Sequence, residues 1–391
     1  MKLTALMLVW LIAAGGVWAV AGASGLGLGG ELIPPDDLPP ELPESSPAIR
    51  CPLVPKEDRG AIRSVVYSRD GKTLIAGNMS GMLQWFDSGL GTRTLSRRVL
   101  NRYVGGIETL GFSPDGKILA ALTKLGEVSL LDAATGTLRL GLEKFPNAQT
   151  FPEMLKFSPD GTLLASSLTS GEILLWDTST GRRRAFLPAH VIPEHMTGPD
   201  FNRFLKPAAP ANISSLAFTS DGHSLVSESG IVRTWGVNTG REVARWEDPS
   251  RGEYYGKFAL APDDSTLAMS HLLAKDRRLG GAGRLDLRDR ASGRRIAQLP
   301  TQGRVNDLKF LPDGNTLVSL EDDRIVRLWD VATAQQLAAI RFDHHNNLDC
   351  LAVSPDGKWI AACGYESDPI FGIIYQLETD GSSLKLWKPQ P

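Results

Sequence analysis

Cysteine is scarce in this sequence, and neither sign of charge dominates it. Three cysteines in 391 residues cannot form a disulfide scaffold. The 42 lysine and arginine residues nearly balance 44 aspartate and glutamate residues, which leaves a formal net charge of −2. A nucleic-acid partner requires a concentrated positive field, so we expect none. A hydrophobic content of 42% is enough for a packed core, and 40 glycines with 25 prolines predict many turns.

The motifs of common catalytic and metal sites are also missing. The sequence has no G-x-S-x-G element, no CxxCH and no His or Cys spacing typical of zinc. His190, Glu194 and His195 are close in sequence, but Pro193 breaks the helix that would align them. Residues 25–30 (GLGLGG) match the dinucleotide-binding pattern, yet an apolar leader precedes them and a proline-rich stretch follows. We therefore expect no cofactor and no enzymatic activity.

Long apolar runs are absent except at the start of the chain. Lys2 is the only charge before Glu31, and small residues follow the apolar run. Residues 1–23 are interpreted as a signal peptide or, alternatively, as a membrane anchor long enough for a bilayer of about 30 Å. Residues 24–47 form a Gly/Pro-rich linker. Either alternative predicts that residues 48–391 lie outside the cytoplasm, periplasmic or secreted or held at the membrane by this N-terminal segment alone.

A short motif then recurs along the chain. Ser-Pro-Asp-Gly occupies residues 113–116, 158–161 and 354–357, and four looser copies bring the total to seven. Proline presets φ, aspartate caps the turn and glycine allows positive φ, so each copy predicts a tight hairpin connection. The aspartates of the seven copies are Asp70, Asp115, Asp160, Asp221, Asp263, Asp313 and Asp356.

The residues around each copy predict four strands per repeat. Apolar residues two apart, such as Leu110 and Phe112, precede the turn and indicate a packed strand. A second strand follows the turn, and a third ends in an aromatic–acidic pair such as Trp329-Asp330. In the last copy the matching pair is Trp387-Lys388. A Thr-Gly turn then leads into a fourth strand.

This order of Ser-Pro-Asp-Gly, Trp-Asp and Thr-Gly turns resembles the WD-repeat family over residues 48–391, with degenerate repeats of a bacterial exported type. The resemblance implies an all-β fold: a seven-bladed β-propeller of four-stranded antiparallel blades around a channel. It also implies that the protein holds partners and does not catalyse a reaction. The Gly-His pair of the family is missing from most copies, so its buried His–Ser–Asp–Trp network is expected to be mostly absent.

The last blade needs an outer strand from elsewhere if its third strand ends at Trp387. Residues 51–56 (CPLVPK) occupy the phase of a fourth strand relative to the first turn. We therefore predict that residues 48–55 close the ring as the N-terminal strand of the last blade. Pro52 and Pro55 are tolerable at an outer edge.

Three long segments are predicted to lie on one face of the propeller: residues 187–211, 271–284 and 364–382. Loops on a rigid scaffold commonly carry binding, so this face is the predicted site for an unidentified protein partner. In residues 364–382, Phe371, Ile373 and Tyr375 belong to an apolar run that suggests a contact surface. The alternative is a pair of strands that extends beyond the blade and packs on itself.

Seven residues before each turn aspartate lies a mostly polar column that starts the innermost strands. Its members Arg63, Glu108, Glu153 and Asp349 are candidate partner-binding residues at the channel mouth. Solvated channel residues are the default interpretation. The alternative function is a propeller hydrolase or ligand sensor with a metal or small molecule at the channel mouth.

Cys350 and Cys363 are expected on neighbouring strands of the seventh blade. Export would permit a disulfide. Directly paired strands give poor disulfide geometry, so the favoured interpretation is two buried thiols.

Overall fold

The structure is a computed structural model that describes most of the second of its two compact units, Glu41–Pro391. The predicted leader (1–23) and linker (24–47) lie outside the described residues. Those residues are 49–50, 60–90, 93–98, 105–142, 152–188, 213–247, 253–273, 284–301, 303–322, 324–342, 346–367 and 370–386. None of them forms a helix long and apolar enough to cross a bilayer.

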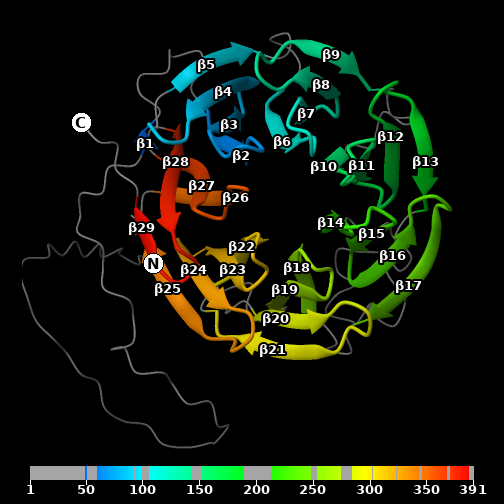
Figure 1. Ribbon diagram of the computed structural model, residues 1–391, viewed down its shortest axis with the longest axis vertical. Coiled ribbons are helices and arrows are strands. Elements are labelled where there is room, and N and C mark those ends of the chain that lie inside the picture. Colours follow the sequence, from blue (N-terminus) through cyan, green and yellow to red (C-terminus); the bar gives the residue numbers. More distant parts are fainter. Residues whose placement is uncertain are drawn as a thin grey trace, which may run out of the picture. The chain divides into compact units, whose positions relative to one another are not determined.

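Antiparallel strands form seven sheets, which confirms the predicted seven-bladed propeller (Figure 1). Six blades run β2–β5, β6–β9, β10–β13, β14–β17, β18–β21 and β22–β25, and the seventh contains β26–β29 with β1. The bounds for blades one to three are β2 Ile62–Tyr67, β3 Thr73–Asn78, β4 Met82–Asp87, β5 Arg93–Arg98, β6 Ile107–Phe112, β7 Ile118–Thr123, β8 Val128–Asp132, β9 Leu138–Gly141, β10 Pro152–Phe157, β11 Leu163–Leu168, β12 Ile173–Asp177 and β13 Arg183–Leu187. Those for blades four to seven are β14 Ser215–Phe218, β15 Ser224–Glu228, β16 Ile231–Gly236, β17 Arg241–Glu247, β18 Glu253–Leu260, β19 Thr266–Leu273, β20 Arg284–Asp289, β21 Arg295–Leu299, β22 Val305–Phe310, β23 Thr316–Glu321, β24 Ile325–Asp330, β25 Gln336–Arg341, β26 Asn346–Val353, β27 Trp359–Ser367, β28 Ile370–Thr379, β29 Leu384–Leu386 and β1 Ile49–Arg50.

The core lies between neighbouring blades. Trp85 and Leu83 of blade one pack with Ile107, Leu110 and Leu119 of blade two in one buried cluster. Corresponding clusters join the other blades, because each apolar column of an innermost strand faces its neighbour. The radial sheets therefore bury both faces.

The repeated turn connects the first two strands of each blade and also connects blades. In blade two, the Ser113 hydroxyl donates a hydrogen bond to the Asp115 carboxylate (2.5 Å). The same carboxylate accepts a hydrogen bond from the Lys117 amide (3.0 Å). The proline of one turn packs on the positive-φ glycine of the next turn around the ring. This contact joins Pro114 to Gly161, Pro159 to Gly222, Pro262 to Gly314, Pro312 to Gly357 and Pro355 to Gly71.

Two junctions lack the proline and use polar contacts instead. Arg69 replaces proline in the first turn and donates to the carbonyl of Pro114 (2.6 Å). Ser220 replaces it in the fourth turn, and its amide and hydroxyl both donate to Asp264 (2.8 and 2.6 Å). Asp264 holds the position that glycine has elsewhere, at a φ of 63°. The ring of turns is thus continuous through all seven blades.

The seventh blade differs from the prediction. Its third strand is β28, which ends at Thr379, so Trp387-Lys388 does not end a third strand. Most of the described residues of 364–382 are therefore strand residues and not a surface loop: β27 and β28 pair from Trp359↔Glu378 to Ser367↔Ile370. The alternative of two extended, paired strands is the one that the structure contains. Its physical reason is a run of branched and aromatic residues that favours strand formation.

Both ends of the described chain share the outer position of the seventh blade. β29 pairs with the end of β28 at Leu377↔Leu386, and β1 pairs with its middle at Ile49↔Ile374. The predicted N-terminal strand exists, but over Ile49–Arg50 and together with β29, whereas residues 51–59 lie outside the described part. Gln376 of β28 also donates to the carbonyl of Ser88 in blade one (2.7 Å), across the seam of the ring.

A disulfide joins Cys350 of β26 to Cys363 of β27, so the expectation of two thiols is wrong. The two residues are direct partners in the strand register and their Cα atoms lie 5.2 Å apart, within the range that disulfides span. The register shifts between Leu348 and Cys350, which changes the local strand geometry at this pair.

Candidate functional site

The innermost strands of all seven blades enclose a central channel. A cavity of about 710 Å³ is lined by residues from β2, β6, β10, β14, β18, β22 and β26. A second cavity of about 460 Å³ lies toward the repeated turns and is lined by residues such as Phe112, Phe310 and Pro355. We call the end with the repeated turns the turn rim. The other end, with the second–third turns and the connections between blades, is the loop rim.

The predicted polar column lies where the channel opens on the loop rim. Arg63 and Asp349 approach to 3.4 Å across the seam between blades one and seven. Burial raises the pKa of the Asp349 carboxyl, although the positive charges of Arg63 and Arg304 oppose that change. Glu108 lines the same cavity, while Glu153 lies on β10 with its side chain outside the described part. The structure therefore brings Arg63, Glu108 and Asp349 to one cavity.

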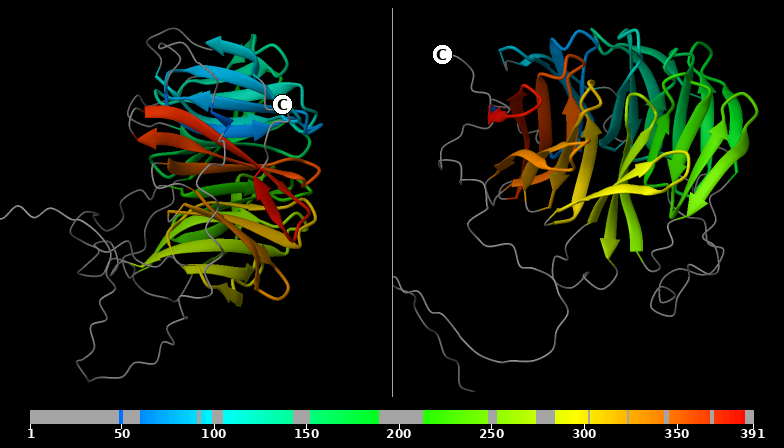
Figure 2. Two further views of the ribbon diagram at one scale, coloured as in Figure 1. Left: turned by 90° about the vertical axis from the view of Figure 1, so that its left-hand side faces the viewer. Right: turned by 60° about the horizontal axis from the view of Figure 1, so that its bottom comes forward.

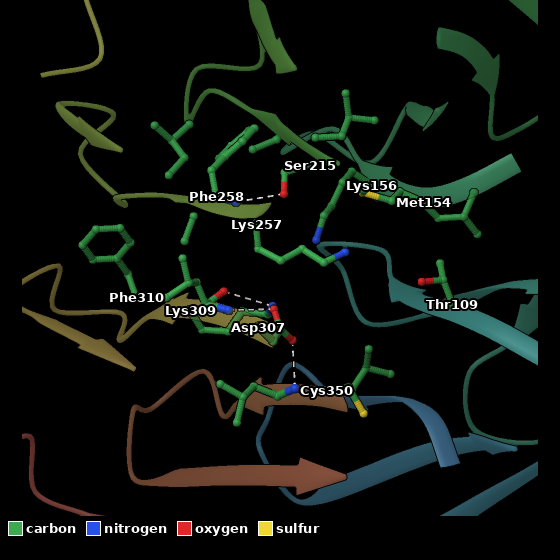
Figure 3. A pocket seen from close by; sticks show the side chains of 18 of the residues that line it. Thr109, Met154, Lys156, Ser215, Lys257, Phe258, Asp307, Lys309, Phe310 and Cys350 are labelled. Atoms are coloured by element: carbon green, nitrogen blue, oxygen red, sulfur yellow. Dashed lines mark hydrogen bonds and ion pairs between the residues drawn. The ribbon is translucent and has the colours of Figure 1, made fainter. Parts of the chain in front are cut away.

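Three lysines deeper in the channel were not singled out from the sequence. Lys156 of β10, Lys257 of β18 and Lys309 of β22 line the cavity, and Figure 3 shows Lys156 and Lys257 pointing toward one another into its open space. A sequence signal existed. Lys156 and Lys309 both lie four residues before a turn aspartate, where the other blades have valine, glycine or alanine.

Asp307 is the acidic member of this group. Its carboxylate accepts hydrogen bonds from the Lys309 ammonium group (2.6 Å) and from the Leu351 amide of the next blade (2.8 Å). Burial favours a higher pKa for Asp307, but the charge and hydrogen bond of Lys309 and the Leu351 amide outweigh it, so the pKa is lowered. Asp307 is thus an ionised group that also connects blades six and seven.

Lys156 carries its charge in an unfavourable environment. Its side chain is exposed within the open channel. Desolvation by the surrounding blades lowers the pKa of Lys156 to about 8, the charges of Lys309 and Lys257 contribute, and Asp307 opposes the change. Among the described residues, no group of three or more His, Cys, Asp or Glu side chains is arranged to hold a metal ion.

The loop rim is uneven. β18 and β19 have eight residues each, and β27 and β28 have nine and ten, whereas the corresponding strands of the other blades have four to six. In the left view of Figure 2, the orange and red strands of blade seven reach past the neighbouring blades. The side chains of Met79 and Leu125, in the second–third turns of blades one and two, are 42% and 54% exposed.

The predicted binding segments have different outcomes. Of residues 187–211, only 187–188 are described, and of 271–284 only 271–273 and 284 are described. Phe371, Ile373 and Tyr375 all lie on β28, where their backbones pair with Glu366, Gly364 and Ala362. They are therefore strand residues and not loop residues, and their side chains lie outside the described part.

Comparison with known proteins finds repeats of one kind. Residues 154–177, 293–330 and 337–368 match the family model described as WD domain, G-beta repeat. The chain is 29% identical over 161 residues to transcription initiation factor TFIID subunit 5 of Caenorhabditis elegans, which covers 38% of this chain. It is 37% identical over 76 residues (19% of this chain) to an uncharacterized WD repeat-containing protein of Schizosaccharomyces pombe. It is 32% identical over 84 residues (21% of this chain) to WD repeat and SOCS box-containing protein 1 of Xenopus tropicalis.

These similarities are confined to parts of the relatives. The aligned stretches span 22%, 19% and 20% of the three proteins, respectively. The repeats are shared, whereas the remaining four fifths of each relative have no counterpart in these alignments.

Proposed function

Because this chain carries WD repeats that close into a seven-bladed propeller, we propose that it is a non-enzymatic scaffold that binds a protein through its loop rim. The observation that carries this proposal is the asymmetry of the two rims. On the turn rim, one proline–glycine contact recurs at five of the seven junctions. The loop rim bears the lengthened ends of β18 and β19 and the lengthened hairpin β27–β28. Variation on one end of a rigid scaffold is typical of a binding surface.

Exposed apolar side chains on the loop rim support the same proposal. Met79 and Leu125 lie in neighbouring blades, next to the Gly105-Gly106 connection between them. The centres of protein interfaces are rich in apolar residues and poor in charged residues. The near balance of positive and negative charge favours a protein partner over a nucleic acid.

Affinity capture with rim variants tests this proposal. Met79→Asp/Leu125→Asp places charge on the loop rim, and the matched control Leu90→Asp changes a 64% exposed leucine in the third–fourth turn of blade one, on the turn rim. We expect one partner to be retained by the wild type and by the control but lost by the double variant. A partner set that is the same for all three proteins contradicts binding through this part of the loop rim.

We further propose that the propeller works outside the cytoplasm, after export or at the membrane through residues 1–23. The Cys350–Cys363 disulfide supports this proposal, because disulfides persist in oxidising compartments. Titration of the unfolded, unreduced full-length protein is expected to give one free thiol per chain, and three after reduction. Three thiols without reduction, in protein isolated from its own cell, would contradict export.

The competing possibility of a ligand sensor is favoured by a separate observation, the group of lysines in the channel.

A further inference from the structure

Positive charge is concentrated at one level of the channel. Lys156, Lys257 and Lys309 come from blades three, five and six, and Asp307 is the acidic group beside Lys309. Asp307 pairs with Lys309, while no described residue forms an ion pair with Lys156 or Lys257. Two ammonium groups thus face the open space without an adjacent counter-charge among the described residues (Figure 3), and Asp307 attracts both at longer range.

The groups nearer the loop rim do not supply that counter-charge. Asp349 is paired with Arg63, and its pKa is raised because of burial. Glu108 is the remaining described carboxylate that lines the cavity at this mouth. A negatively charged ligand that enters from the loop rim would therefore pass Glu108 before it reaches the lysines.

We propose that the channel binds an oxyanion with two or more negative charges, a phosphate group or a polycarboxylate, between Lys156, Lys257 and Lys309. Each lysine presents up to three N–H donors on a flexible stem and binds such a group as a point charge. The cavity of about 710 Å³ is large enough to hold a whole small molecule around the anionic group. This site is independent of the proposed partner on the loop rim.

The state of Lys156 supports this inference. Desolvation in the channel, with a further contribution from the repulsion of Lys309 and Lys257 and against the attraction of Asp307, lowers its pKa to about 8, so near that pH part of the population has lost the charge. A bound dianion reverses the repulsion and favours the charged form. Binding near pH 8 is therefore coupled to proton uptake at Lys156.

Calorimetric titration of the purified full-length protein tests the site with three probes: inorganic phosphate, citrate and triglutamate. Phosphate represents a phosphoryl group, citrate a small polycarboxylate, and triglutamate an acidic segment of a protein. Lys156→Met and Lys257→Met keep a long side chain without the charge. The matched control is Lys124→Met, an exposed lysine in the second–third turn of blade two.

We expect at least one probe to bind the wild type and Lys124→Met equally, and each channel variant about tenfold more weakly, since each loses a charge-assisted hydrogen bond. At pH 8 the heat should differ between Tris and HEPES buffers for the wild type. This difference should become smaller for Lys156→Met, and the part that remains is assigned to Glu228, whose pKa is also about 8 and which interacts with Lys257. Unchanged melting of the channel variants excludes misfolding as the cause, and Lys257→Met serves if Lys156→Met fails to fold. No binding of any probe up to about 10 mM, well above the Kd of a weak site, or equal binding by both channel variants, overturns the proposal.

Discussion

At the scale of single residues, the surprise is the number of ionisable groups inside the blades. Glu228, Asp286 and Glu321 are at most 1% exposed, on strands that the sequence pattern marks only as apolar. Asp286 lies 2.9 Å from Arg288 and 3.4 Å from His271, and Glu321 pairs with Arg327. A two-residue periodicity identifies the buried face but not the polar residues within it, because their partners come from the folded blade.

Two tryptophans form part of the His–Ser–Asp–Trp hydrogen-bond network that the resemblance to WD repeats implies. Trp235 and Trp329 donate to Ser227 and Ser319 of their own blades, at 2.8 Å in both cases. In blade six the Ser319 hydroxyl then donates to Glu321 (3.0 Å). The tryptophan–serine part of the network is thus present in these two blades, and Glu321 accepts from the serine hydroxyl in one of them.

Glu228 gives a prediction for stability against pH. Burial raises its pKa from an ordinary 4.5 to about 8, although the Gly230 amide and the charge of Lys257 oppose the change. Between these two values Glu228 binds more protons in the folded protein than in the unfolded protein, so its contribution to stability falls as pH rises from about 4.5 to about 8 and is constant above that pH. Glu228→Gln removes this loss, and we expect the variant to gain more than about 1 kcal/mol on the wild type between pH 5 and pH 9.

Urea unfolding at the two pH values measures this gain. Glu127→Gln, an exposed glutamate in a second–third turn, is the matched control and should leave the difference unchanged. A gap between Glu228→Gln and the wild type that is independent of pH would show that Glu228 is not protonated in the folded state.

At the scale of elements, the repeated turn was predicted as a hairpin connection, and its second role appeared only in the structure. The sequence identifies proline and glycine within most copies, whereas their contact joins one copy to the next, such as Pro114 to Gly161, 47 positions apart. The third strand of blade seven was mispredicted for a related reason. Trp387 has the residue type expected at a strand end, but the extended β27–β28 hairpin moves the true end to Thr379.

The fourth and fifth turns provide a test of this contact. Ser220→Pro removes both hydrogen bonds to Asp264, and Asp264→Gly removes their acceptor while relieving the positive φ. We expect each single variant to be destabilised and the double variant to regain the proline–glycine contact of the other junctions. The coupling energy in a double-mutant cycle by urea unfolding should be about 1 kcal/mol or more.

A pair of substitutions in distant blades serves as the control for that double-mutant cycle. Ser220→Pro and Lys358→Ala lie in blades four and seven, and we expect their effects to add. Additive effects at 220 and 264 as well would mean that the two turns do not depend on each other.

At the scale of the whole molecule, the blade count and strand order follow from the spacing of seven motifs, but the closure does not. The seam combines β1, β29 and an apolar cluster in which Ile62 and Phe86 of blade one pack with Ala361 and Ile374 of blade seven. The channel lysines were missed at the same scale. Lys156 and Lys257 are 101 positions apart in sequence, and only ring closure makes them face one another.

Truncation tests the contribution of the N-terminal strand to closure. Deletion of residues 1–47 retains β1, whereas deletion of residues 1–56 removes its pairing with Ile373 and Ile374 of β28. Each backbone hydrogen bond contributes about 1 kcal/mol, so we expect the melting temperature to fall by a few degrees in the longer deletion alone. Calorimetry of both proteins measures this, and equal melting would mean that β29 and the apolar seam suffice.

Ser220 and Asp264 stand where other copies of the turn have proline and glycine, and they determine which two blades can be neighbours at this junction. At five of the seven junctions the turns meet through the same proline–glycine contact, so these turns do not distinguish one neighbour from another. Blade four is different, because Ser220 in its turn finds a carboxylate acceptor, Asp264, only in the turn of blade five. A variant of this protein with its blades in another order would therefore have to keep blades four and five next to each other.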